Sequence, residues 1–214
     1  MVLRKFFVFA VIFFAAQGLW AQADGTRPSL EQVSAALARN KVTRGLFVLE
    51  RTAANKSRSL KSSGTFVIAA ACGIIWKTEK PIKAAQVMAK EFALTENSVG
   101  KRTRIRASEN PVYLQMALLT SALWANDLAA VQGAADIDFS SEGDSWQMAL
   151  FPKDAAVGAA LEKIVVAGIC GESQASVTKI QSFLKNGNSA SYSLSGLSYG
   201  GSLTQEERSY FEIP

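Results

Sequence analysis

The segment from Leu60 to Pro81 restricts the fold of this chain more than any other. Its sequence is LKSSGTFVIAAACGIIWKTEKP, in which a bend of small residues at 69–73 separates two apolar runs. Alternate residues of each run share one face of a strand: Gly64, Phe66 and Ile68 in the first, and Ile74, Trp76 and Thr78 in the second. A period of two is typical of half-buried strands, so the segment predicts a β-hairpin that ends at Pro81.

Both faces of this predicted hairpin are apolar. Val67 and Ile75 lie on the faces opposite to those of Phe66 and Trp76. A sheet that is apolar on both sides needs a second cover, because one core buries only one of its faces. The sequence therefore predicts that either a helix layer or a bound apolar molecule covers the second face.

The N-terminus has the pattern of a cleavable secretory signal peptide over residues 1–23. Arg4 and Lys5 precede the apolar run at 6–16, and the small residues Ala21 and Ala23 frame a cleavage site. The apolar run is too short to span a membrane comfortably. We expect cleavage after Ala23 and export from the cytoplasm. The signal is not a lipoprotein signal, because the residue directly after the cleavage point is Asp24 and not a cysteine.

The mature chain that this cleavage predicts, residues 24–214, is expected to form a single domain. It lacks Arg4 and Lys5, two of the 23 Lys and Arg residues of the whole chain, and keeps all 18 Asp and Glu residues. Its net charge of about +3 is too small to suggest nucleic-acid binding. No second long apolar run follows, so we do not expect an integral membrane protein.

The chain contains no histidine. This excludes the Ser-His-Asp and Cys-His arrangements of nucleophilic catalysis and every metal site that needs a histidine ligand. The remaining candidates for acid-base chemistry are carboxylates of a predicted strand and turn, interpreted here as solvated: Asp136, Asp138, Glu142 and Asp144. The sequence therefore predicts no enzymatic activity, no cofactor and no metal.

Two cysteines are present. Cys72 lies in the bend of the predicted hairpin, and Cys170 lies near Gly168 and Gly171 at the end of a later strand. An even number of cysteines in an exported chain is compatible with one disulfide, and two buried thiols are the alternative.

The rest of the chain combines short strands with turn signals. Ser29 and Gln32 fit a capping box, which predicts a first helix that ends near Asn40, and a helical turn is expected at 155–161. Strands are expected at 42–52, 62–69, 73–78, 101–107, 134–140, 145–151, 161–168, 174–184 and 189–198. This spacing favours a strongly curved antiparallel sheet. The expected fold class is α+β: an unclosed half-barrel with a lid of two or three helices on its concave face.

The clearest helix of the sequence follows Pro111 and runs from 112 to 124. It is apolar nearly all round, which indicates burial on most sides. We expect it to form the lid, extended by a short turn at 128–131. The expected lid residues are Val112, Leu114, Met116, Leu119 and Leu123.

In their order along the chain these motifs resemble the periplasmic outer-membrane lipoprotein carrier proteins, the LolA-like family, and especially its divergent branch. The matching segments are the strand at 44–51, S-S-G-x-F at 62–66, G-I-I-W-K-T at 73–78, the segment 124–128, and W-x-x-x-L-x-P at 146–152. Together they cover roughly residues 28 to 200. The resemblance also implies strand structure at 84–95, where composition alone favours a helix.

The resemblance implies a carrier in the periplasm that binds the acyl chains of a lipoprotein or lipid in a hydrophobic cavity and shuttles them toward the outer membrane. Its expected partners are the acylated cargo, an inner-membrane export complex as donor and an outer-membrane acceptor. The cavity is expected on the concave face, lined by Phe47, Leu49, Phe66, Ile68, Ile74 and Trp76. The alternative is the opposite strand parity, with Leu46, Val48, Val67 and Ile75 facing inward.

The chain departs from the family at one position. In the best-known members an arginine in the loop between the two hairpin strands bonds to the lid and helps to hold it shut. The matching position here is about Ala70, inside a run of three alanines. The latch therefore does not carry over, and neither does the exact identity of the family's cargo and partners.

Three arginines share one face of the strand expected at 101–107: Arg102, Arg104 and Arg106. They are candidates for contact with anionic headgroups or with a partner protein. The alternative is the solvated face of an edge strand that discourages aggregation.

A second class of function is compatible with the same scaffold. A non-enzymatic interaction or sensor domain of the cell envelope could use the half-barrel without any ligand, because one fold hosts unrelated functions.

Overall fold

The computed structural model describes residues 27–55, 59–106, 109, 122, 124–172 and 174–212. The predicted signal peptide lies outside the described residues. So do the five predicted lid residues Val112, Leu114, Met116, Leu119 and Leu123. Of the predicted lid helix, only Ala122 and Trp124 are described.

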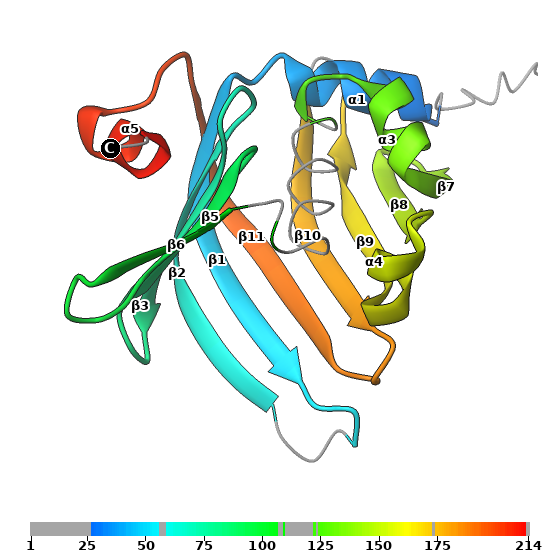
Figure 1. Cartoon of the computed structure of the whole chain (residues 1–214). Coiled ribbons are helices and arrows are strands. Elements are labelled where there is room, and N and C mark those ends of the chain that lie inside the picture. Colours follow the sequence, from blue (N-terminus) through cyan, green and yellow to red (C-terminus); the bar gives the residue numbers. More distant parts are fainter. Residues whose placement is uncertain are drawn as a thin grey trace, which may run out of the picture.

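One antiparallel sheet of eleven strands curves around a concave face (Figure 1). The strands are β1 (Val42–Thr52), β2 (Ser59–Ala69), β3 (Gly73–Lys80), β4 (Ala84–Ala89), β5 (Phe92–Glu96), β6 (Arg102–Arg106), β7 (Ala135–Glu142), β8 (Ser145–Pro152), β9 (Leu161–Cys170), β10 (Ala175–Leu184) and β11 (Ser189–Gly200). Strands β6 and β7 form the two edges and do not pair with each other. The α+β half-barrel expected from the sequence is confirmed.

Two meanders make up this sheet and join at its centre. Strands β1 to β6 follow one another on one side, and β7 to β11 on the other. The joint is the pairing of β1 with β11, which runs from Val42 opposite Gly200 to Thr52 opposite Ser189. The middle of the sheet therefore depends on strands from opposite ends of the chain.

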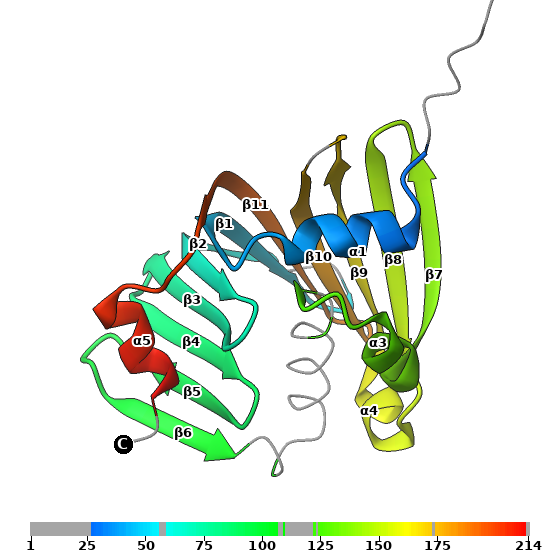
Figure 2. The same ribbon diagram turned by 90° about the horizontal axis from the view of Figure 1, so that it is seen from above.

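Four helices are described: α1 (Leu30–Ala38), α3 (Leu128–Ala134), α4 (Ala155–Ala160) and α5 (Gln205–Phe211). The capping box predicted for α1 is confirmed, since the Ser29 and Gln32 side chains each accept a hydrogen bond from the other residue's backbone N–H. Helix α1 contacts β10, α3 contacts β7, and α4 contacts β8 and β9. Helix α5 instead contacts β3 and β4 on the other side of the sheet (Figure 2).

Most predicted elements are confirmed, and three details differ. Residues 84–95 are strand, as the resemblance implies, but they form two strands, β4 and β5, that pair with each other. The turn expected at 128–131 is the longer helix α3. Helix α5 was not predicted, because its short, mostly polar sequence QEERSYF has little apolar periodicity.

Two separate cores bury the two faces of the hairpin β2–β3. Phe66, Ile68, Ile74 and Trp76 belong to the core on the concave side. The second core contains Val67 and Ile75 together with Val42, Ala85, Val87, Ala89, Phe92, Leu94 and Tyr210 of α5. On the outer face, helix α5 therefore supplies the second cover that the sequence requires.

Cys72 and Cys170 are free thiols, so the disulfide alternative does not apply. No helix among the described residues is long and apolar enough to cross a membrane.

Candidate functional site

Strand register brings the predicted cavity residues together on the concave face. Phe66 on β2 lies opposite Trp76 on β3, and Phe47 on β1 lies opposite Gly64. All six predicted residues are buried in the same core: Phe47, Leu49, Phe66, Ile68, Ile74 and Trp76. The alternative parity is not inward, because Leu46 and Val48 are exposed.

Four aromatic rings pack against one another at the centre of this face, and we call them the aromatic floor: Phe47, Phe66, Trp76 and Tyr192. The Trp76 ring lies 5.2 Å from the Phe47 ring in an edge-on arrangement and 5.5 Å from the Phe66 ring, between centroids. Tyr192 on β11 completes the floor, at 4.4 Å from Trp76 and 5.9 Å from Phe47. Each such pair adds roughly 0.5–1.5 kcal/mol beyond the burial of its area.

The contact between Trp76 and Tyr192 depends on the curvature of the sheet. Their strands, β3 and β11, are separated by β2 and β1. In a flat sheet these backbones would be about 14 Å apart, because neighbouring strands lie roughly 4.8 Å from each other. Side chains of such strands meet only on the concave side, so the 4.4 Å contact shows that the floor faces into the half-barrel.

Gly64 lies beneath the floor, between Phe47 and the β3 strand. A Cβ atom at this position would lie 1.9 Å from the backbone oxygen of Lys77. Only glycine allows so close an approach of two backbones. The glycine of the S-S-G-x-F motif therefore permits the tight packing of β2 against β3.

A polar row bounds the floor on the side of β4 and β5. Gln86 lies opposite Trp76, Thr95 lies opposite Gln86, and both side chains are exposed. At the β1–β2 end the boundary is Arg51, which interacts with the Tyr192 hydroxyl. Burial raises the pKa of Tyr192, and Arg51 opposes that rise. The floor is thus an apolar surface with polar side chains along two of its edges, the β4–β5 side and the β1–β2 end.

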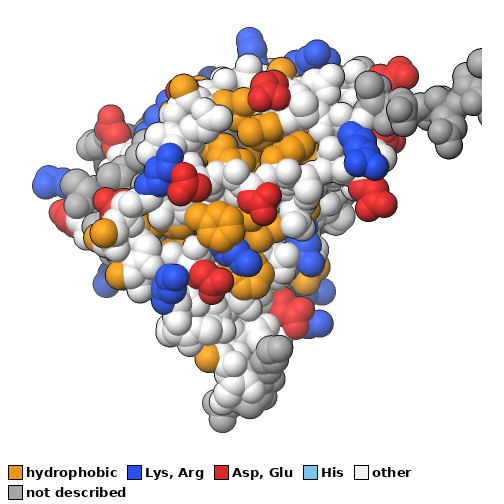
Figure 3. All heavy atoms as spheres, turned by 90° about the vertical axis from the view of Figure 1, so that its right-hand side faces the viewer, with side chains coloured by type: hydrophobic (Ala, Val, Ile, Leu, Met, Phe, Trp, Pro, Cys, Tyr) orange, Lys and Arg blue, Asp and Glu red, His pale blue; other side chains and the backbone are white. Residues whose placement is uncertain are grey.

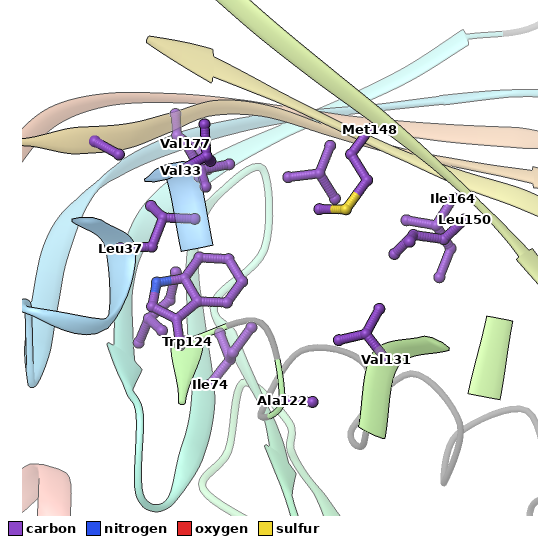
Figure 4. Close-up of a cluster of buried hydrophobic side chains, with 14 of the residues drawn as sticks. Val33, Leu37, Ile74, Ala122, Trp124, Val131, Met148, Leu150, Ile164 and Val177 are labelled. Carbon is purple, nitrogen blue, oxygen red and sulfur yellow. The ribbon is translucent and has the colours of Figure 1, made fainter. Parts of the chain in front are cut away.

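Helices bound the floor on its other side, over β7 to β10. Val33 and Leu37 of α1, Val131 of α3 and Val157 of α4 share a core with side chains of β8, β9 and β10. Figure 4 shows this region, with Trp124 close to Leu37 and Ile74 and with Met148 and Leu150 farther along the sheet. Trp124 therefore connects the helical side of the core to the hairpin β2–β3.

The floor is closed in this structure. Phe47 and Phe66 are each 1% exposed and Trp76 is 5% exposed. A cavity next to Phe66 and Ile68, also lined by Trp124 and Leu194, has a volume of about 10 Å³. That is at the lower limit for one water molecule, so a longer ligand would require side chains to move.

On the outer face, α5 is attached to the sheet by polar contacts around the second core. Arg44 of β1 donates two hydrogen bonds to the Glu207 carboxylate, at 2.7 and 2.6 Å. Lys77 of β3 forms an ion pair with Glu206, and its ammonium group lies 4.8 Å from the centre of the Tyr210 ring. These contacts hold a helix on the face opposite to the floor.

The three arginines of β6 lie on this outer face. Arg102 pairs with Glu96 at 2.6 Å and lies over the Tyr210 ring. Arg104 donates a hydrogen bond to the backbone oxygen of Glu212 at 2.9 Å and lies over the Phe92 ring. Arg106 is exposed, and β6 is an edge strand. Two of the three arginines are therefore engaged in holding the C-terminal segment.

The candidate acids lie away from the floor. Asp136, Asp138, Glu142 and Asp144 are all exposed, and Asp136 pairs with Lys153 at 3.3 Å. In the part of the chain that the structure describes, no three acidic or cysteine side chains gather in a way that could hold a metal ion.

Sequence reasoning missed two contributors to this site. Tyr192 and Leu194 of β11 join the same core as the predicted residues. Tyr192 and Leu194 alternate with serines in SASYSLSG, so the period-two signal was present. Their position beside β1 could not be inferred, because no local pattern shows that the last strand pairs with the first.

No family model matches the chain, and no curated protein does. Solved structures of similar fold do exist. A LolA superfamily protein from Nitrosomonas europaea matches with a TM-score of 0.44 and 13% identity, over 86% of this chain and 96% of that one. A DUF1329 family protein from Desulfovibrio piger matches with a TM-score of 0.49 and 11% identity, over 86% of this chain and 96% of that one.

An outer-membrane lipoprotein-sorting protein domain from Vibrio parahaemolyticus is also similar, with a TM-score of 0.44 and 12% identity, over 83% of this chain and 94% of that one. At these identities and TM-scores the likeness says nothing about a ligand, so the function has to follow from the site itself.

Proposed function

We propose that this protein is a carrier that binds the acyl chains of a lipoprotein or lipid on the aromatic floor and shuttles them through the periplasm toward the outer membrane. The observation that carries the proposal is the contact between Trp76 and Tyr192 across two intervening strands. This contact supports the interpretation that the floor is one continuous apolar surface inside an open half-barrel, with polar side chains at its edges. Such a surface suits an apolar chain with a polar head.

The closed floor suggests how the cargo is both bound and released. An acyl chain of about fifteen methylenes gains on the order of 12 kcal/mol from transfer out of water. Against this stands the loss of the contacts that already bury Phe47, Phe66 and Trp76. The two terms oppose each other, so the net affinity is modest and the cargo can be passed on.

The proposal includes the partners that such a route requires. An inner-membrane export complex would donate the cargo, and an acceptor at the outer membrane would receive it. Arg102 and Arg106 of β6 are both exposed, but Arg102 pairs with Glu96, so Arg106 is the member of the arginine set best placed to meet a partner or a headgroup. The protein itself would act without catalysis.

The first test uses a spin-labelled fatty acid as a quencher of tryptophan fluorescence in the mature chain, residues 24–214. We expect quenching in the unmodified protein, because Trp76 would contact the acyl chain. Trp76→Phe should lower that quenching, although Trp124 in the same core still contributes, whereas Trp146→Phe, a replacement on β8, should keep it. The pocket assignment fails if the unmodified protein shows no quenching or if Trp76→Phe quenches as strongly as Trp146→Phe.

A matched pair on β1 tests the face of the sheet independently. Leu49 is 3% exposed in the concave core, and its neighbour Val48 is 48% exposed on the outer face. Leu49→Asn should weaken the binding of the fatty acid about tenfold or more, because a polar group would then face the chain. Val48→Asn should leave binding unchanged. Equal affinities of the two folded variants would contradict the proposal.

Mass spectrometry of organic extracts separates this function from an interaction or sensor domain. Stoichiometric lipid in protein purified under native conditions supports the carrier. An extract without lipid favours a domain that uses the half-barrel without a ligand.

A further inference from the structure

The three most exposed large apolar side chains of the described residues lie at one end of the sheet. They are Leu60, Ile82 and Val99, with exposed fractions of 70%, 66% and 83%. A single exposed aliphatic side chain is ordinary on a protein surface. Three such side chains at one end of the sheet, on alternate hairpins of the same meander, need a physical cause.

Sheet topology places the three residues together. Leu60 is the second residue of β2, Ile82 lies between β3 and β4, and Val99 lies between β5 and β6. In a meander of antiparallel strands, the β1–β2, β3–β4 and β5–β6 connections all fall at the same end. Figure 1 shows these hairpin ends in succession, from the lower end of β2 to the turn between β5 and β6.

The turn that carries Val99 is well ordered. The Asn97 side chain accepts hydrogen bonds from the backbone N–H groups of Val99 and Lys101, at 3.1 and 2.9 Å. Gly100 has a φ of +80°, which closes the turn without strain. Turn tips usually carry Gly, Pro, Asn, Asp or Ser. The hydrogen bonds of this turn therefore keep Val99 at its tip, where the side chain is available to a partner.

Each apolar tip is accompanied by exposed lysines. Lys61 follows Leu60, Lys80 and Lys83 flank Ile82, and Lys101 follows Val99. Among the nearby carboxylates, Glu96 is paired with Arg102 at 2.6 Å, and Glu50 accepts a hydrogen bond from Ser59 and lies 3.9 Å from the ammonium group of Lys61. Glu79, next to Lys80, is exposed. The four lysines and Arg102 still outnumber these three carboxylates. The end of the sheet therefore presents aliphatic tips within a surface of positive charge.

We propose that this end of the sheet docks on the surface of an anionic lipid bilayer. The docking surface, which we call the lysine rim, consists of Leu60, Lys61, Lys80, Ile82, Lys83, Val99 and Lys101. The aliphatic tips enter the layer between headgroups and acyl chains, and the lysines contact the lipid phosphates. Separate tips on successive turns suit a soft, continuous surface better than the pocket of a partner protein, which requires one contiguous apolar patch.

The lysine rim borders the aromatic floor. Leu60 lies opposite Arg51 in the β1–β2 register, and Arg51 interacts with the Tyr192 hydroxyl of the floor. Docking would thus bring one end of the concave face to the bilayer. The docking itself does not depend on the proposed transport of acyl chains.

Vesicle flotation with the mature chain tests the proposal. We expect binding to vesicles of phosphatidylcholine mixed with phosphatidylglycerol, weaker binding at high salt, and little binding to phosphatidylcholine alone. The triple replacement Lys61→Gln, Lys83→Gln and Lys101→Gln should lower affinity on the order of 100-fold, at roughly fivefold for each lysine. The control Lys41→Gln, Lys90→Gln and Lys179→Gln removes the same charge from elsewhere on the sheet and should cost much less.

A second pair of variants tests the apolar tips. Leu60→Ser, Ile82→Ser and Val99→Ser together should lower affinity about tenfold or more, because no apolar area then enters the bilayer. The control replaces exposed apolar residues of the outer face, Leu46→Ser, Val48→Ser and Ile169→Ser, and should bind normally. In Figure 3 the side of the molecule that carries β7 and β8 shows apolar side chains among charges of both signs, so that side offers no comparable basic surface.

The outcomes separate clearly. Failure of the unmodified protein to bind anionic vesicles overturns the proposal and leaves an acidic partner protein as the ligand of the rim. Equal losses in the rim variants and in their controls also overturn it, because binding would then reflect net charge alone. Quenching by the spin-labelled fatty acid is measured without vesicles, so it tests the acyl-binding function separately.

Discussion

At the scale of single residues, Glu207 has the pKa that departs most from its ordinary value among the described residues. Its side chain is 11% exposed and accepts hydrogen bonds from Arg44 and from the backbone N–H of Thr204. The bonds from Arg44 lower the pKa of Glu207 from 4.5 to about 2, although burial opposes this. Since the folded state favours the ionised carboxylate, this stabilisation is complete above pH 4.5 and is lost as the pH falls toward 2.

Glu207→Gln should therefore lower the free energy of unfolding by about 2–3 kcal/mol at neutral pH. The difference from the unmodified protein should shrink below pH 4.5 and become small near pH 2, because the Glu207 carboxyl of the folded protein is then about half protonated and that of the unfolded chain is neutral. Urea denaturation at several pH values, followed by tryptophan fluorescence, measures both effects.

The neighbouring residue provides the control. Glu206 also pairs with a basic residue, Lys77, but its side chain is 73% exposed. Glu206→Gln should change the free energy of unfolding by less than about 1 kcal/mol, as is usual for exposed ion pairs. Equal losses in the two variants would show that burial of Glu207 has no special effect.

At the scale of single elements, α5 acts as the cover of the outer core. Tyr210 is 5% exposed, packs with the apolar side chains of β2 to β5, and lies between Lys77 and Arg102. Its hydroxyl group is 3.5 Å from the Glu96 carboxylate, which is a weak contact. The ring, and not the hydroxyl group, should therefore supply most of the attachment.

Tyr210→Ala should destabilise the protein by about 3 kcal/mol, in the range of other deletions of buried aromatic rings. Tyr210→Phe keeps the ring and should cost less than about 1 kcal/mol. Denaturant unfolding of both variants measures the difference. A Tyr210→Ala protein as stable as the unmodified one would mean that α5 does not hold the outer core closed.

At the scale of the whole molecule, the pairing of β1 with β11 unites the two meanders. These strands have neighbours on both sides, whereas the edge strands β6 and β7 each have one. Contacts between residues so distant in sequence are slow to form and depend on the complete fold. The centre of the sheet should therefore open only with global unfolding.

Hydrogen exchange followed by mass spectrometry checks this expectation. Backbone amides of β1 and β11 should exchange most slowly, with protection close to the global free energy of unfolding. Amides of β6 and β7 should exchange faster, since edge strands can separate locally. Slower exchange in β7 than in β1 would contradict this picture of the sheet.

The amino-acid sequence determined much of the fold by local patterns. Period-two alternation located most strands, Pro81 marked the end of β3, and the capping box at Ser29 marked the start of α1. All three are properties of neighbouring residues, so they can be recognised without the partner strands. The assignment of β4 and β5 needed the resemblance, because helix propensity was misleading there.

The candidate site was predicted in part. The six residues of β1 to β3 that were predicted to line a cavity form one core, because a parity pattern fixes which side chains share a face. Tyr192 was missed, since its neighbours in the floor come from strands more than a hundred positions earlier in the sequence. The bonds of Arg102 and Arg104 to the C-terminal segment were missed for the same reason.

The sequence by itself thus determined which side chains of each strand are apolar and which share a face. Only the tertiary structure decided what lies against each face: Tyr192 beside Trp76 on the concave side, and α5 over Val67 and Ile75 on the outer side. The physical reason is that alternation belongs to one strand, whereas register and curvature arise when distant strands pair and bury their apolar area together.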